Sequence, residues 1–162
     1  MRHVLTLLLM LFAVASAALA TEDRGTPADG RITGKAALER LVTDQTLYGV
    51  RSDGLSDIEY HHPDGRSAYW YDGCLYRGQW WATEEMLCYL YPTTTWVGPH
   101  CFTAERWAGQ LYMVGVGGAV GMLSIEITDV VAGNSEGFPL DAEGECELVS
   151  QLSDIVPEAI KP

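Results

Sequence analysis

The stretch from Tyr69 to Cys101 decides the fold, and it reads YWYDGCLYRGQWWATEEMLCYLYPTTTWVGPHC. It holds three of the four cysteines and most of the tryptophans. Aromatic and β-branched residues favour strands, whereas Asp72-Gly73 and Glu84-Glu85 interrupt the runs as turn residues do. The stretch therefore predicts consecutive strands of a small antiparallel sheet.

The same pattern of short β-rich runs and turn residues continues on both sides of this stretch. Runs at about ten-residue spacing are typical of an all-β sandwich or barrel. We therefore predict a mainly β fold, a small antiparallel up-and-down β-barrel or sandwich of lipocalin-like or avidin-like shape. The eight predicted strands cover residues 46–50, 57–61, 66–71, 75–83, 86–91, 101–107, 111–116 and 122–131.

A short N-terminal helix is predicted before the first strand, over residues 34–43. Thr33 is the expected N-cap, and Ala37, Leu38, Leu41 and Val42 form one apolar stripe. A helix this short needs tertiary packing to persist. We expect it to lie against the sheet or to plug one end of a barrel.

The first twenty residues have the features of a signal peptide. Arg2 and His3 precede an apolar run at 4–14, and a small-x-small pattern ends at Ala20. The run is too short to cross a bilayer of about 30 Å as a helix. We expect cleavage after Ala20, a periplasmic or secreted location in a bacterium, and no stable membrane span afterwards.

The remaining chain divides by composition into three parts. Residues 21–32 are polar and predict a flexible leader. Residues 33–138 are the single β-rich domain with its N-terminal helix, and residues 139–162 are an acidic C-terminal tail in which 147–155 could add one or two helical turns. At about 140 residues the mature chain is one domain by length and long enough to bury a core unaided.

The strong negative charge excludes one class of partner. The chain has 22 acidic and 10 basic side chains, a formal charge of −12. An anionic surface repels the phosphate backbone of nucleic acids and anionic lipid headgroups. We expect no nucleic-acid partner, and the charge is what solubility requires.

The four cysteines of an exported chain point to disulfide bonds, with three possible connectivities. No pair has C-x-x-C spacing, which disfavours a redox site or a zinc knuckle. Cys88 and Cys101 lie at corresponding points of two successive apolar runs, which favours pairing them. Cys74 and Cys146 are then left to tie the C-terminal tail to the sheet.

No cofactor and no metal site is predicted. A dinucleotide fingerprint over the glycine-rich stretch 115–121 would need glycine where Val120 stands. Glu59, His61 and His62 offer metal ligands, but neighbouring strand residues point to opposite faces, so only one histidine can join a given site. In the acidic run 141–147 the glycine is fourth, whereas a calcium loop needs it sixth.

No catalytic residue is predicted either, and the expected protein is not an enzyme. Glu84 and Glu85 are adjacent turn residues, which are usually solvated and so lack the contrasting environments of an acid/base pair. Four oxidised cysteines exclude a Cys-His mechanism. An enzyme would need His61 or His62 beside His100 and a carboxylate in one pocket.

Aromatic side chains occur on both faces of the predicted strands. Tyr69 and Tyr71 share one face while Trp70 lies on the other, and the same alternation separates neighbouring residues further on. One set fills the interior; the other either covers the outside of a small barrel or stacks on sugars or anchors a protein partner. The candidate binding aromatics are Trp70, Trp80, Trp81 and Trp96.

The order of several short motifs resembles a family of small exported bacterial proteins that is catalogued as a domain of unknown function. The motifs are TLYG at 46–49, PDGR at 63–66, GQW at 78–80, LCY at 87–89, Cys101-Phe102 and Gly133-Asn134. The resemblance covers residues 37–138 and implies an exported β-rich fold with a Cys88–Cys101 bridge, and no activity. Gln45 stands where the family usually has asparagine, and Cys74 and Cys146 are additional.

These observations predict an exported, non-catalytic binding protein for a small ligand or an envelope protein. An interior without a cavity of about 300 Å³ would argue against the small ligand. The alternative is a secreted inhibitor of a cationic hydrolase such as lysozyme, with loop 92–99 as the inserted element. An enzyme with a His/carboxylate site is the third hypothesis.

Overall fold

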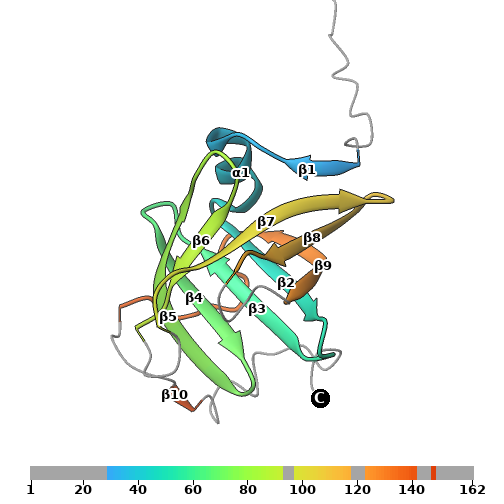
Figure 1. Ribbon diagram of the computed structural model, residues 1–162. Helices are drawn as coiled ribbons and strands as arrows, with labels where there is room; N and C mark the ends of the chain where they lie inside the picture. Colours follow the sequence, from blue (N-terminus) through green and yellow to red (C-terminus); the bar gives the residue numbers. More distant parts are fainter. Residues whose placement is uncertain (1–28, 93–96, 118–122, 142–146, 149–162) are drawn as a thin grey trace, which may run out of the picture.

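The chain forms a closed antiparallel β-barrel in a computed structural model, which describes residues 29–92, 97–117, 123–141 and 147–148 (Figure 1). Each barrel strand pairs with its neighbours in sequence, and β2 pairs with β9 to close the ring. The predicted up-and-down barrel is thereby confirmed, with every predicted strand present. The barrel strands are β2 (Gln45–Arg51), β3 (Ser56–His61), β4 (Arg66–Tyr71), β5 (Cys74–Ala82), β6 (Leu87–Leu90), β7 (His100–Trp107), β8 (Gln110–Gly115) and β9 (Ser124–Ala132).

One end of the barrel is closed by the helix α1 (Lys35–Val42). Leu38 and Val42 are fully buried in the interior core, and α1 contacts β2 and β5. Figure 1 shows the helix across the upper end of the barrel. The predicted helix is confirmed, but the predicted cap is wrong: Gly34 is the N-cap, and no side chain caps the helix.

The segment before the helix also belongs to the sheet. Gly30–Ile32 forms a short strand, β1, that pairs antiparallel with β7. The prediction of a flexible leader up to residue 32 is therefore wrong for these three residues. β7 extends beyond its pairing with β6, and β1 pairs with this remaining part of its backbone, which explains why Gly30–Ile32 is a strand without any apolar pattern in the leader.

Two layers of side chains flank strands β2 to β5. The interior core includes Leu47, Tyr69 and Trp80, whereas a second cluster lies on the outer face and includes Ile58 and Leu75. The chain after β9 folds back over this outer face, where Phe138 is only 2% exposed. Both faces of these strands are therefore buried.

Polar contacts hold the returning segment in place. Thr46 donates its hydroxyl hydrogen to the carbonyl of Gly133 at 2.6 Å, and the hydroxyls of Tyr48 and Ser135 hydrogen-bond at 2.8 Å. Asn134 bonds both the N–H and the carbonyl of Phe138. Arg77 Nε also donates to the carbonyl of Pro139 at 2.8 Å, so the first residue of the predicted acidic tail is held against the folded domain.

A tenth strand, β10 (Glu147–Leu148), pairs with β5 opposite Leu75 and Cys74. The helical turns predicted from residue 147 are therefore wrong for its first two residues. The backbone of these two residues finds hydrogen-bond partners on β5. A short helix would have to form all of its hydrogen bonds within itself, which is marginal at this length.

The Cys88–Cys101 bridge is confirmed, with an S–S distance of 2.04 Å. The two cysteines lie directly opposite each other on β6 and β7. Cys74 is also disulfide-bonded, and its predicted partner, Cys146, lies outside the described residues, as does the predicted signal peptide. Among the described residues no helix has the length and apolar character to cross a membrane.

Candidate functional site

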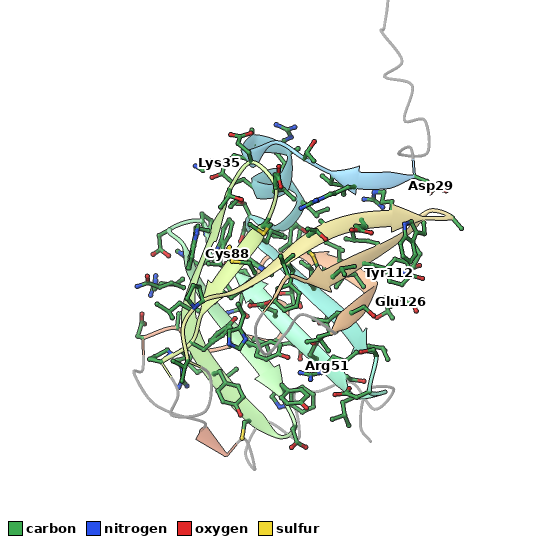
Figure 2. All side chains as sticks on the ribbon, in the orientation of Figure 1. Asp29, Lys35, Arg51, Cys88, Tyr112 and Glu126 are labelled. Carbon is green, nitrogen blue, oxygen red and sulfur yellow. A yellow bond between two sulfur atoms is a disulfide. The ribbon has the colours of Figure 1, made fainter. Side chains whose placement is uncertain are left out.

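The barrel encloses a cavity of about 400 Å³ at the end opposite α1. Since α1 directly precedes β2, Arg51 at the end of β2 marks the far end of the barrel, where Figure 2 shows it. Most lining residues at this end are half-buried, whereas most of those towards α1 are buried, so the cavity opens here. The lining residues are Leu47, Arg51, Asp57, Glu59, Tyr69, Tyr71, Tyr89, Tyr91, His100, Phe102, Met113, Leu123, Ile125 and Ile127.

Strand β3 supplies a row of ionisable side chains to the interior. Successive side chains of a strand alternate between its faces, so Asp57, Glu59 and His61 share the inner face. Ile58 and Tyr60 point outward into the cluster beneath Phe138. The strand thus carries its apolar face outside and its polar face inside.

Asp57 and Arg51 are connected through Tyr69 near the open end. Arg51 Nη1 donates to the Tyr69 hydroxyl at 3.4 Å, and that hydroxyl donates to Asp57 Oδ2 at 3.2 Å. Burial raises the pKa of Asp57 to about 6, although the Tyr69 hydrogen bond and the Arg51 charge act against the rise. At neutral pH Asp57 is therefore mainly ionised and balanced by Arg51.

Arg51 is held by further contacts on its other side. Its Nη2 lies 3.1 Å from Asp53 Oδ2, and its guanidinium carbon lies 4.1 Å from the ring centre of Tyr71. Its Nε is buried and has no hydrogen-bond partner among the described residues. One N–H of the guanidinium is thus left for an acceptor.

Glu59 lies two residues further along β3 towards α1, and its side chain is 18% exposed. It accepts a hydrogen bond from the Tyr91 hydroxyl, which in turn accepts one from Ser67 at 3.1 Å. Burial raises the pKa of Glu59 to about 8, and the nearby Asp57 charge adds to the rise, whereas the Tyr91 hydrogen bond lowers it. Glu59 is therefore mainly protonated at neutral pH when the cavity is empty.

His61 is the fully buried neighbour of Glu59. Its Nε2 lies 3.7 Å from Glu59 Oε2 and 3.0 Å from the Tyr89 hydroxyl, and its Nδ1 lies 3.4 Å from the Gln45 carbonyl. Burial lowers the pKa of His61 to about 3. The imidazole is therefore neutral near pH 7 and does not supply a positive charge for Glu59.

Two glycines make room for these side chains. A Cβ on Gly49 would lie 2.4 Å from Asp57 Oδ1, and a Cβ on Gly78 would lie 2.6 Å from Tyr91 Cδ1. Strand glycines often mark places where another group approaches closely. The positions of Asp57 and Tyr91 therefore depend on the absence of a side chain on the neighbouring strand.

Four tyrosines form much of the cavity wall. Tyr69 stacks on Tyr71 with ring centres 6.0 Å apart, and Tyr89 stacks on Tyr91 at 6.5 Å. Tyr69 and Tyr91 bring the two pairs together, with centres 5.5 Å apart. The predicted alternation at Tyr69, Trp70 and Tyr71 is confirmed, because Trp70 packs on the outer cluster.

The predicted binding tryptophans do not gather at one place. Trp80 is 7% exposed in the interior core and donates its indole N–H to the His62 carbonyl at 2.9 Å. Trp70 is half-buried in the outer cluster, and Trp81 is 39% exposed. Trp96, together with the centre of the predicted inserting loop, lies outside the described residues.

The histidines separate as the strand alternation predicts. His61 faces inward, whereas His62 pairs with Asp64 in the turn, its Nδ1 2.7 Å from Oδ1. His100 lines the cavity together with Asp57 and Glu59. Within the described part of the chain, no three His, Cys, Asp or Glu side chains are placed to hold a metal ion.

Arg51, Asp57 and the tyrosines were not predicted as site residues, and Glu59 was considered only as a possible metal ligand. The available signal was the alternation in β3, where Asp57, Glu59 and His61 interleave with Ile58 and Tyr60. On its own this pattern places the apolar residues in the core and the polar residues in water. Trp107, 58% exposed beside Tyr112, was also not identified as an exposed aromatic.

No family model, curated protein or solved structure matches this chain. The resemblance by motif order therefore stays a prediction, and the cavity is the feature of this chain that bears on its function.

Proposed function

We propose that this chain is an exported, non-catalytic binding protein that holds a small ligand inside its barrel. The observation that carries the proposal is the 400 Å³ cavity, open at one end and closed at the other by α1. Ligand pockets are mostly apolar cavities of about 300–1,000 Å³ with a few converging polar groups. Here aliphatic and aromatic side chains surround Arg51, Asp57 and Glu59.

Export to the periplasm or the medium is part of the same proposal. The basic start, the apolar run and Ala18-Leu19-Ala20 support a cleaved signal peptide. The Cys88–Cys101 bridge supports an oxidising compartment, because disulfides persist mainly there. Mass spectrometry of the protein from its own cells tests this point, and a mature chain beginning at Thr21 is expected.

Retention of a ligand is tested by native mass spectrometry of the same preparation. The expected result is a mass above that of the chain, lost on denaturation. Ile125→Trp places a bulky indole ring at the cavity mouth. Because this ring would block the cavity, the added mass should disappear. Val130→Trp is the matched control on the same strand, since Val130 is 41% exposed and does not line the cavity. Equal retention by both variants would contradict binding in the cavity.

A catalytic role is the second candidate, because Glu59, Asp57 and His100 line one cavity with His61 beside Glu59. A carboxyl with a pKa of about 8 is protonated at neutral pH, as a general acid must be. Mass spectrometry of the recovered ligand separates the two candidates. Binding returns the ligand unchanged, whereas catalysis converts it with time in the wild type and not in Glu59→Gln.

A further inference from the structure

Two carboxyl groups, those of Asp57 and Glu59, line the cavity, but only one permanently charged cation, Arg51, lines it with them. Asp57 is balanced by Arg51 through Tyr69. The basic group that contacts Glu59 is His61, whose Nε2 lies 3.7 Å from Oε2 and which is neutral near pH 7. No Lys or Arg forms an ion pair with Glu59 among the described residues.

The groups facing Glu59 from the surrounding strands do not change this balance. Leu47 on β2 is apolar, and Ser67 and Tyr69 on β4 are uncharged. Tyr89 on β6 and Tyr91, just after that strand, have pKa values well above the ordinary value because they are buried. On β7, burial lowers the pKa of His100 below its ordinary value.

The tyrosine wall is suited to a positive charge. A cation within about 6 Å of a tyrosine ring centre is attracted by the negative face of the ring. The cavity already contains one such contact, because the Arg51 guanidinium carbon lies 4.1 Å from the centre of the Tyr71 ring. Tyr69, Tyr89 and Tyr91 continue this wall towards Glu59.

Arg51 does not make the cavity an anion site. Its charge faces Asp53 on one side and, through Tyr69, Asp57 on the other. An anion in the cavity would be repelled by Asp57 and would face the Glu59 carboxyl. The partnerless Nε of Arg51 suits an uncharged oxygen acceptor on the ligand instead.

We propose that the ligand is a small organic monocation, an amine or quaternary ammonium compound, whose charged group lies against Glu59 among Tyr69, Tyr89 and Tyr91. This inference rests on the proposed binding function and specifies its ligand class. Binding converts the Glu59 carboxylic acid to a carboxylate and releases that proton to solvent, so the charge inside the barrel stays unchanged. The cation then provides the partner that Glu59 lacks.

Isothermal titration of purified, ligand-stripped protein tests the proposal with matched probes. The probes are choline and its uncharged isostere 3,3-dimethylbutan-1-ol, with benzyltrimethylammonium as a larger cation. At least one of the two cations is expected to bind. If choline binds, its Kd should be at least tenfold lower than that of its uncharged isostere. Glu59→Gln should weaken cation binding at least tenfold, whereas Glu126→Gln, an exposed carboxylate on the outside of β9, should not.

The pH dependence in the wild type needs no variant. Because both probe cations are permanently charged, only the protein changes protonation. The apparent Kd should fall about eightfold between pH 6.5 and 7.5, above the range in which Asp57 titrates, and level off above about pH 8. Proton uptake or release at pH 7, measured in buffers of different ionisation enthalpy, should show about one proton released per cation bound.

Three results would overturn the inference. They are equal binding of choline and its isostere, unchanged cation binding by Glu59→Gln, and a preference for carboxylate ligands. If a neutral or anionic ligand occupies the cavity and Ile125→Trp expels it, the binding function stands and the cation proposal fails. If native protein retains nothing and no probe of any charge binds, both fail.

Discussion

Glu59 is the residue whose position most needs a functional explanation. A carboxyl group inside a barrel loses hydration, and a protein compensates for this by pairing or by protonation. Tyr91 donates one hydrogen bond to it, and Gly78 leaves the space that the Tyr91 ring occupies. A barrel built only for stability would place an aliphatic side chain here.

The stability of the empty protein should therefore fall with rising pH. The pKa of Glu59 is about 8 in the folded state against an ordinary value of 4.5, so the folded state binds more protons between these values. The free energy of unfolding should drop by about 2 kcal/mol between pH 6.5 and 9, as followed by urea denaturation. Below pH 6.5 two further groups change the free energy of unfolding. The raised pKa of Asp57 makes it fall with rising pH, whereas the lowered pKa of His61 makes it rise, so the contribution of Glu59 is obscured there.

Glu59→Gln should remove most of this pH dependence, because an amide does not titrate. Glu126→Gln serves again as the control and should keep the wild-type slope, since Glu126 is exposed. A wild-type slope in Glu59→Gln would show that another group loses the proton. In that case Glu59 would not be the group that exchanges a proton for the ligand cation.

The segment after β9 is the element that sequence patterns did not reveal as structural. Phe138 is 2% exposed and packs on the outer cluster of Ile58, Tyr60 and Leu75. Phe138→Ala should lower the free energy of unfolding by about 3 kcal/mol, within the usual range for a buried phenylalanine. Tryptophan fluorescence should also shift to the red, because Trp70 packs on the same cluster.

Val97→Ala is a suitable control for that measurement. Val97 is 90% exposed, and exposed substitutions usually change stability by less than about 0.5 kcal/mol. If Phe138→Ala matches this control, the segment would be a loosely attached tail. Cavity binding would then not depend on it.

Local patterns predicted the strands but not which of their faces is inside. Turn residues and β-rich runs gave the eight strands, because each depends on near neighbours. Trp70 and Tyr60 are apolar yet lie outside the barrel, and only the returning Phe138 segment explains why. That contact joins residues about 70 positions apart, whereas the period of apolar residues along a strand reports only on near neighbours.

At the scale of the whole molecule, closure of the ring creates the site. The β2–β9 pairing brings Arg51 opposite Ile125 and so places the cavity mouth. Helix α1 closes the other end with Leu38 and Val42. The sequence predicted a helix that either lies against the sheet or plugs one end of a barrel, but the size and polarity of the interior depend on all strands together. Neither property follows from any single strand.

The same closure predicts how the molecule responds to loss of its Cys88–Cys101 bridge. The bridge joins two cysteines that are 13 residues apart in the sequence and lie on neighbouring strands. For a loop of this length the entropy model gives a stabilisation of about 3 kcal/mol. The Cys88→Ala, Cys101→Ala double variant should lose about that amount in urea denaturation. It should nevertheless keep the far-ultraviolet circular dichroism of the wild type, because β6 and β7 remain paired within a continuous ring.

Ligand binding by that double variant distinguishes a stabilising bridge from a functional one. Tyr89 and His100, next to the two cysteines, both line the cavity and pair across the same strands. If the ring alone positions them, the variant should bind the wild type's ligand with an unchanged Kd at 25 °C while melting at a lower temperature. A weakened Kd in a fully folded variant would instead mean that the bridge sets the spacing of the cavity wall between β6 and β7.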